Sequence, residues 1–173
     1  MADIKYLIDS DVFIQAKNLF YRFDFCMPFW EWISDAHAAG LVFTIDKVKN
    51  EITDGDADDP ARIWIENAPN SFFLKDTGDA SVMKSYATTI KWATDSTHYT
   101  PLAIKDYANH SKADAFLVAT AMHHGHVIVT QERNDPACKK RIPLPDAADA
   151  VGVKTIHVYD MLSMHSTPAF KLK

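Results

Sequence analysis

The sequence has few of the residues that mark several classes of protein. Only two cysteines, Cys26 and Cys138, occur among 173 residues, and they form no Cys-x-x-Cys pair. Zinc ribbons and thioredoxin-like redox chemistry are therefore excluded, and both cysteines are expected to remain thiols. Five glycines and eight prolines exclude collagen-like and low-complexity chains. No apolar run approaches the roughly 18 residues that a membrane span requires, so no membrane partner is expected.

The first five residues lead directly into the short apolar run of the first expected strand. They show no basic segment followed by the longer apolar segment of a signal peptide. We therefore expect the cytoplasm as its compartment. A length of 173 residues, 47% of them hydrophobic, suits one domain that spans residues 1–173.

The net charge of −5 counts against a nucleic-acid partner, because proteins that bind nucleic acids are usually basic. The objection is partial, since a site built from carboxylates becomes far less negative once divalent cations fill it. Basic residues also gather near the acidic segments discussed below, and a solvated surface of mixed charge explains each of them equally well. These basic residues are Lys47, Lys49, Lys105, Lys112, Arg133, Lys139, Lys140 and Arg141.

Short apolar runs alternate with segments of helical pattern. Strands are expected at residues 5–8, 41–44, 127–130 and 154–158, with 72–74 as either a strand or a buried link. Helices are expected at 12–23, 28–39, 46–52, 60–67, 81–93, 101–109, 113–124, 145–151 and 159–164. This alternation predicts an α/β fold in three layers, with a central, mostly parallel sheet of about four or five strands flanked by helices.

Acidic and hydroxyl side chains lie next to the expected strands. Asp9 directly follows the first strand, Glu51 lies in the helix after the second, and Asp114 opens the helix before residues 127–130. Because ligands bind beyond the carboxyl ends of parallel strands, we expect these side chains at one edge of the sheet. The other polar residues at these positions are Ser10, Asp11, Thr130, Glu132 and Asp135.

Carboxylates gathered at one edge repel one another unless a cation lies between them. Such hard oxygen ligands suit Mg²⁺ or Mn²⁺. Two such ions about 3.5–4 Å apart activate water and stabilise the leaving oxygen of a phosphodiester. Each acid has a simpler interpretation when taken alone: Asp9 as a helix cap, Glu51 as a solvated helix residue and Asp114 as a favourable charge at a helix N-terminus.

Four segments resemble the motifs of PIN domains. Residues 7–14 (LIDSDVFI) resemble the opening of the family, and 49–52 (KNEI) its second acidic position. Residues 113–121 (ADAFLVATA) resemble the third position and are the most specific segment, and 127–132 (VIVTQE) resemble the strand with its threonine and fourth acid. Residues 25–32 (FCMPFWEW) and the segment from 141 to 154 look like a PIN-like subgroup, the DUF4411 proteins.

The resemblance implies a PIN-like fold and a metal-dependent endoribonuclease, often the toxin of a toxin–antitoxin pair with a cognate antitoxin protein as partner. Its metal ligands would be Asp9, Glu51, Asp114 and Glu132, with Mg²⁺ or Mn²⁺ bound. Ser10 and Thr130 would be polar supports, and Asp11 stands where asparagine is commoner. Glu132 stands where aspartate is commoner, which leaves Asp135 as an alternative fourth ligand. Lys47, Lys112 and Arg133 are candidate contacts for RNA phosphates.

Two other interpretations stay open at this point. Residues 9–12 (DSDV) also match the opening of haloacid-dehalogenase phosphatases, although the later acidic pair of those enzymes is missing. A PIN-like module that binds protein or RNA without cutting is the second, and no residue excludes it. The aromatic residues between Phe20 and Trp32 are expected in the core or at the face of a homodimer.

Overall fold

The computed structural model describes residues 4–173. The prediction that no signal peptide precedes the first strand falls partly on residues 1–3, which lie outside the described range. Within that range, no helix is both long enough and apolar enough to cross a membrane.

Five parallel strands form one sheet in the order β3-β2-β1-β4-β5. The strands are β1 (Tyr6–Ile8), β2 (Val42–Ile45), β3 (Phe73–Leu74), β4 (Val127–Val129) and β5 (Thr155–Ile156). Of the segment 72–74, which was expected as a strand or a buried link, Phe73 and Leu74 form the strand β3, and Phe72 ends the 3₁₀ turn η2 (Asn70–Phe72). All three residues of β1 are buried, as expected for a central strand that is covered on both faces.

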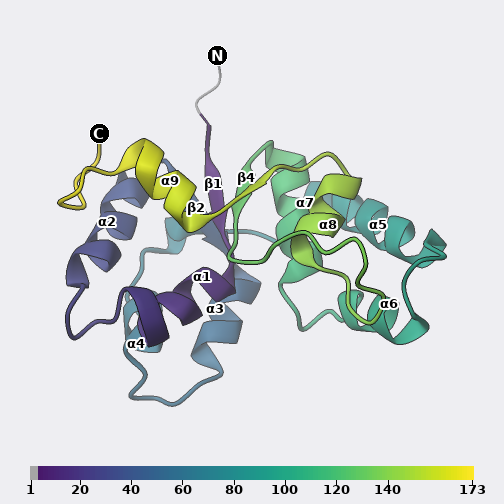
Figure 1. Ribbon diagram of the computed structural model, residues 1–173, viewed down its shortest axis with the longest axis horizontal. Coiled ribbons are helices and arrows are strands. Elements are labelled where there is room, and N and C mark those ends of the chain that lie inside the picture. Colours follow the sequence, from purple (N-terminus) through teal and green to yellow (C-terminus); the bar gives the residue numbers. More distant parts are fainter. Residues whose placement is uncertain (1–3) are drawn as a thin grey trace.

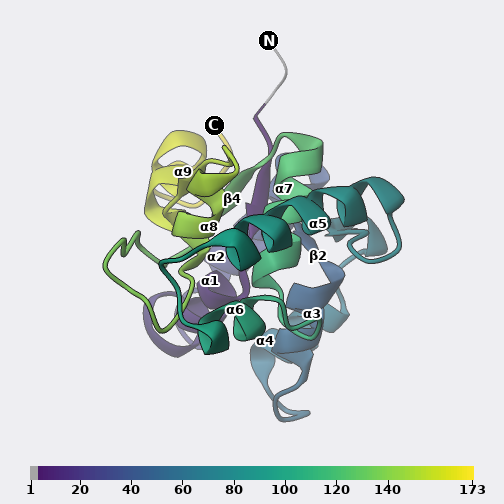
Figure 2. The same ribbon diagram turned by 90° about the vertical axis from the view of Figure 1, so that its right-hand side faces the viewer.

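Helices cover both faces of the sheet. The α-helices are α1 (Ser10–Gln15), α2 (Met27–Ala38), α3 (Asp46–Thr53), α4 (Pro60–Glu66), α5 (Ala80–Asp95), α6 (Pro101–Tyr107), α7 (Asp114–His124), α8 (Leu144–Ala150) and α9 (Val158–His165). Figure 1 shows α2 and α9 on one side of the strands, and α5, α7 and α8 on the other. Figure 2 faces this second layer and shows α5 lying across α7. The predicted three-layer α/β fold is confirmed.

The first helix departs from the sequence prediction. A single helix was expected over residues 12–23, whereas α1 ends at Gln15 and the π-helical turn η1 (Ala16–Phe20) follows it. Tyr21 then leaves the helical conformation, and its carbonyl accepts a hydrogen bond from the indole N–H of Trp30 at 2.7 Å. Tertiary contact with α2 therefore ends this helix earlier than the local pattern predicts.

Aromatic residues fill the core beside α1 and α2. Trp30 is fully buried, and its ring contacts Phe23, Trp64 and Phe13 at centroid distances of 4.1, 5.1 and 6.2 Å. The predicted core position of Trp30 and Trp32 is confirmed, since neither is exposed. This packing fixes α1, and with it the residues that follow β1.

Gly125 ends α7 in the left-handed conformation, with φ of 69°, and no atom lies within 4 Å of the position that a β-carbon would occupy. Alanine at this position would be strained by its backbone alone. We expect Gly125→Ala to lower the free energy of unfolding by about 1 kcal/mol. Gly78→Ala is the matched control, because its added methyl group also meets no atom but its φ is not in the left-handed region. Equal urea midpoints for the two variants would contradict this account.

Candidate functional site

The acidic residues lie where the strand order of the sheet reverses. β1 has β2 on one side and β4 on the other, so the crevice beyond the carboxyl ends of β1 and β4 is the switch point of the fold. Asp9 is the first residue after β1 and the N-cap of α1, where its Oδ1 accepts a hydrogen bond from the Ser10 N–H at 2.7 Å. Thr130 is the first residue after β4, and its hydroxyl donates to Asp9 Oδ2 at 2.9 Å.

Asp11 joins the same contact from the first turn of α1. Its Oδ2 lies 3.1 Å from the Thr130 hydroxyl, and its two oxygens accept from the Gln131 N–H at 3.1 and 3.0 Å. The predicted polar supports Ser10, Asp11 and Thr130 therefore lie together with Asp9. Asp11 anchors the start of α1 to the residue after β4.

Glu51 and Asp114 approach the same edge from two helices. Because α7 runs back along the sheet before β4, its N-terminus lies at the carboxyl edge of the strands, and Asp114 is its first residue. Glu51 Oε1 accepts from the Ala113 N–H at 2.9 Å, which ties α3 to this terminus. The Asp114 carboxylate accepts no hydrogen bond from any side chain or backbone group in residues 4–173 and stays partly accessible.

Glu132, the predicted fourth acidic ligand, already accepts hydrogen bonds from the protein at both carboxylate oxygens. Its Oε1 accepts from Arg141 Nη1 at 2.8 Å, and its Oε2 from the Leu144 N–H at 3.2 Å. Asp135 is exposed, its N–H donates to Asp146 at 2.9 Å, and its carboxylate is not among the charges that act on Asp9 or Asp114. The structure thus brings together Asp9, Asp11, Glu51, Asp114 and Glu132, and leaves Asp135 outside.

The pKa values of these acids reflect their crowding. Burial raises the pKa of Asp9 well above the usual range, and the charges of Asp11 and Asp114 add to this. Burial, then Glu132 and Glu51, raise the pKa of Asp114 to about 7, against the opposing effects of Lys112 and Arg141. Burial also raises the pKa of Asp11, although bonds from Gln131 and Thr130 oppose it.

Within residues 4–173, Asp9 and Asp114 form no ion pair with a basic side chain. Among the ion pairs within residues 4–173, none involves Asp9, Asp11 or Asp114, and of the clustered acids only Glu132 has a basic partner. Asp9 is only 3% exposed. A buried carboxylate without a cation partner is costly, and it is relieved either by a proton or by a bound cation.

The donor chemistry fits a hard divalent cation that keeps most of its waters. Among residues 4–173, no three His, Cys, Asp or Glu side chains are drawn together closely enough to hold a metal ion by themselves. Glu51 and Glu132 are turned toward protein donors, and Asp114 accepts no bond from the described chain. Each Asp9 oxygen accepts one bond and keeps a second lone pair, so Asp9 and Asp114 are the ligands that remain. Mg²⁺ is commonly bound by one or two carboxylates together with waters and substrate phosphates, so this pair fits it.

The three basic residues that the sequence predicts as contacts for RNA phosphates differ in the groups that surround them. The ammonium group of Lys47 lies over the Phe116 ring, 4.4 Å from its centroid, and Lys112 pairs with Asp106 at 2.6 Å. Arg133 is exposed. Arg141, which the sequence marked only as part of a basic run, contacts Glu132 and lines a pocket beside Asp114. No local pattern could single it out, because residues 130–143 form an irregular loop.

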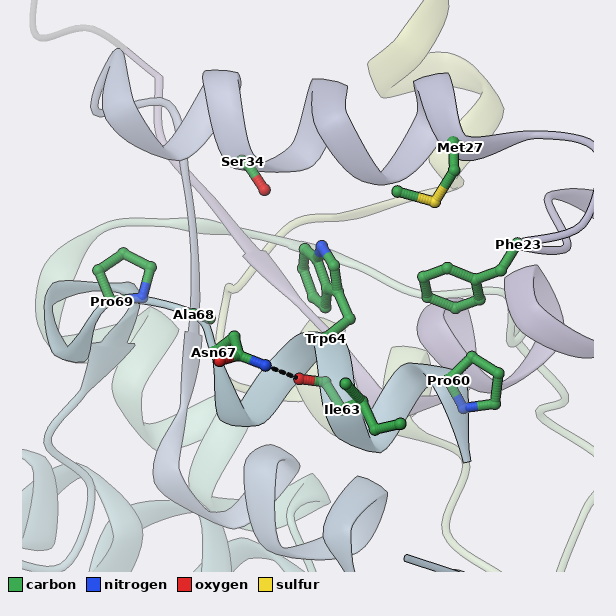
Figure 3. A pocket seen from close by; sticks show the side chains of 9 residues that line it. All are labelled: Phe23, Met27, Ser34, Pro60, Ile63, Trp64, Asn67, Ala68 and Pro69. Atoms are coloured by element: carbon green, nitrogen blue, oxygen red, sulfur yellow. Dashed lines mark hydrogen bonds between the residues drawn. The ribbon is translucent and has the colours of Figure 1, made fainter. Parts of the chain in front are cut away.

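A larger cavity of about 530 Å³ lies between α2 and α4. Figure 3 shows the Trp64 ring rising from α4 toward Ser34 and Met27 of α2, while Asn67 is bonded to the Ile63 carbonyl. None of its nine lining residues titrates. This groove therefore offers no acid–base or metal chemistry, and the carboxylate cluster is the candidate site.

Fold and site together define a class: a parallel three-layer α/β protein with clustered carboxylates at its switch point. Within this class, residues 6–168 match the model of a domain of unknown function, DUF4411. The chain belongs to the DUF4411 family, as the segments 25–32 and 141–154 predicted. No curated protein matches the chain.

We expect the metal-free protein to lose stability as pH rises. Because the pKa of Asp114 is raised to about 7, the folded state holds its proton between about pH 4 and 7, where the unfolded state has released it. The free-energy cost of ionising the buried Asp114 carboxyl is therefore absent below about pH 4 and complete above about pH 7. Asp114→Asn removes this cost. The free energy of unfolding of this variant should therefore exceed that of the parent by about 2–4 kcal/mol at pH 8 and by little at pH 4.5.

Urea unfolding in EDTA across this pH range measures the difference between parent and variant. Asp35→Asn is the control, because Asp35 is exposed on α2. A difference between Asp114→Asn and the parent that does not grow with pH would contradict the assigned burial and repulsion.

Proposed function

We propose that this protein is a PIN-type, metal-dependent endoribonuclease that hydrolyses RNA phosphodiester bonds with Mg²⁺ or Mn²⁺. The observation that carries the proposal is the pair Asp9 and Asp114, which converge at the switch point without a cation partner in the described chain. Buried carboxylates that repel one another destabilise the folded protein. A catalytic cation bound between them offsets this repulsion. The parallel order β3-β2-β1-β4-β5 is consistent with a PIN-like fold and supports the same conclusion.

Under this proposal, some residues of the site bind the cation and others position its ligands. Asp9 and Asp114 hold the cation. The Thr130 hydroxyl donates its one proton to Asp9, and the Gln131 N–H fixes Asp11. Glu51 positions the N-terminus of α7 through the Ala113 N–H. When bound, Mg²⁺ or Mn²⁺ supplies a Lewis acid and lowers the pKa of a bound water.

The phosphatase alternative fits the geometry poorly. A nucleophilic Asp9 would need the acidic pair that haloacid-dehalogenase phosphatases place after a later strand, and the residues that follow β4 and β5 do not supply it. The non-cutting module remains an outcome of the experiments below, because its binding surface does not require the acids to hold a metal.

The toxin role, with a cognate antitoxin as partner, is the finer part of the proposal. It rests on the sequence resemblance to toxins of toxin–antitoxin pairs. Expression of the parent protein in a bacterial host should arrest growth, whereas Asp9→Asn should not. Equal growth with both proteins, while the purified parent cuts RNA, would remove the toxin role and leave the nuclease.

Metal binding should appear as a thermal shift. At a Mn²⁺ concentration about 100 times its Kd, binding adds about 2.7 kcal/mol, which corresponds to a rise of about 5–10 °C in Tm for a chain of this size. Asp9→Asn and Asp114→Asn should lose most of this increment, whatever their Tm in EDTA. Asp35→Asn should keep it. An equal Mn²⁺ increment in all four proteins would place the metal elsewhere.

Cleavage is tested with labelled single-stranded RNA in Mg²⁺ or Mn²⁺, with EDTA as the negative control. We expect Asp9→Asn to cut at least about 100-fold more slowly than the parent, because it removes the most buried ligand. If the variant cuts as fast as the parent, the proposal is wrong. If the parent binds Mn²⁺ through Asp9 and cuts none of a panel of RNAs, the non-cutting alternative replaces it.

A further inference from the structure

A narrow pocket of about 130 Å³ opens beside Asp114. Its walls come from α6, from Lys112 and the first residue of α7, and from the loop that leads to α8. The polar residues that line it are Asp106, Tyr107, Lys112, Asp114 and Arg141. The pocket therefore borders the candidate metal site directly and carries two cations of its own.

The volume limits what the pocket can hold. At about 130 Å³, the pocket has about a quarter of the volume of the cavity between α2 and α4, which is about 530 Å³. A pocket of this size suits a compact anion such as a phosphate group better than a nucleoside. A nucleic-acid strand that crosses the site would thus place part of its backbone here and leave its bases outside.

Arg141 has free donors on the pocket side. Its guanidinium carries five N–H groups, and among residues 4–173 only Glu132 accepts one of them, through Nη1. The side chain of Arg141 is 55% exposed. Lys112 is similar, since its ammonium group bonds to Asp106 and keeps two further N–H groups. Both cations act electrostatically on Asp114, which shows that their charges reach the site.

Glu132 holds Arg141 in place. One of its oxygens accepts from Arg141 and the other from the Leu144 N–H, while its own N–H donates to the Thr130 hydroxyl at 3.1 Å. This chain of bonds connects the end of β4 to the guanidinium group. An arginine oriented in this way presents its remaining donors as a fork, the geometry that matches two phosphate oxygens.

We propose that this pocket is a phosphate subsite for a backbone phosphodiester next to the bond that is cut, with Arg141 as its main ligand and Lys112 as its second. The inference rests on the proposed ribonuclease function, which supplies RNA as the substrate. Glu132 is then a positioning residue for Arg141. The negative charges of Asp106 and Asp114 face the same pocket, and a cation held by Asp114 offsets them when the substrate is bound.

Binding measured with Ca²⁺ in place of Mg²⁺ or Mn²⁺ keeps a divalent cation at the carboxylates, and a gel that shows intact RNA separates this subsite from cleavage. Fluorescence anisotropy of labelled single-stranded RNA should show about tenfold weaker binding to Arg141→Gln than to the parent. The slope of log K against log salt should fall by about 0.7, as expected for one lost phosphate contact on a single strand. Arg141→Lys should recover only part of the affinity, because it keeps the charge and loses the fork.

Arg22→Gln is the matched control. Arg22 is 52% exposed and paired with Asp24 at 2.8 Å, so it resembles Arg141 in exposure and pairing, yet it does not line the pocket. Both substitutions change the net charge equally, and only Arg141→Gln should weaken binding. In cleavage assays with Mn²⁺, Arg141→Gln should raise KM about tenfold with little change in kcat, since a neighbouring phosphate is bound equally in the ground and transition states.

The outcomes distinguish the two proposals. If the parent binds and cuts RNA and Arg141→Gln matches it in affinity, salt slope and KM, the subsite is wrong and the ribonuclease stands. If Arg22→Gln weakens binding as much as Arg141→Gln, net charge explains the effect and the subsite is wrong. If the parent neither binds nor cuts RNA, the ribonuclease proposal itself fails, and the subsite fails with it.

Discussion

Electrostatic repulsion among Asp9, Asp11 and Asp114 is the constraint on which the rest of this site depends. Burial removes the water that would screen their charges. None of the three forms an ion pair within the described chain. Neighbouring groups serve to hold the acids in this arrangement. The Thr130 hydroxyl and the Gln131 N–H fix two of them, and Glu51 fixes the helix terminus from which the third projects. A structure that keeps such a cluster must recover its cost by binding protons or cations.

The topology explains why the cluster forms where it does. The strand order reverses beside β1, so the chain leaves the sheet in opposite directions after β1 and β4 and opens a crevice between them. Asp9 and Thr130 are the residues at which this separation begins. The aromatic packing of α1 and α2 and the docking of α5 on α7 keep the two sides of the crevice fixed. The positions of Asp9 and Asp114 are thus a consequence of the fold, whereas Glu132 is placed by the loop after β4.

The sequence predicted the parts of this account that follow from regular structure. Asp9 and Asp114 could be placed at one edge because each lies at the end of a strand or at the start of a helix that runs back along the sheet. The role of Glu132 could not be predicted, because its partners Arg141 and Leu144 lie across an irregular loop. The π-helical turn after α1 was also missed, since its end depends on Trp30, a residue in another helix. Local patterns report periodicity, whereas these contacts depend on the tertiary path of the chain.

The central claim is that Asp9 and Asp114 jointly bind one divalent cation, and its most direct test is the position of that cation. Crystals grown with Mn²⁺ should show an anomalous difference peak coordinated by the carboxylates of both residues, with the remaining positions taken by water. A Mn²⁺ peak elsewhere would contradict the account. So would crystals at saturating Mn²⁺ that show no peak in the crevice between β1 and β4.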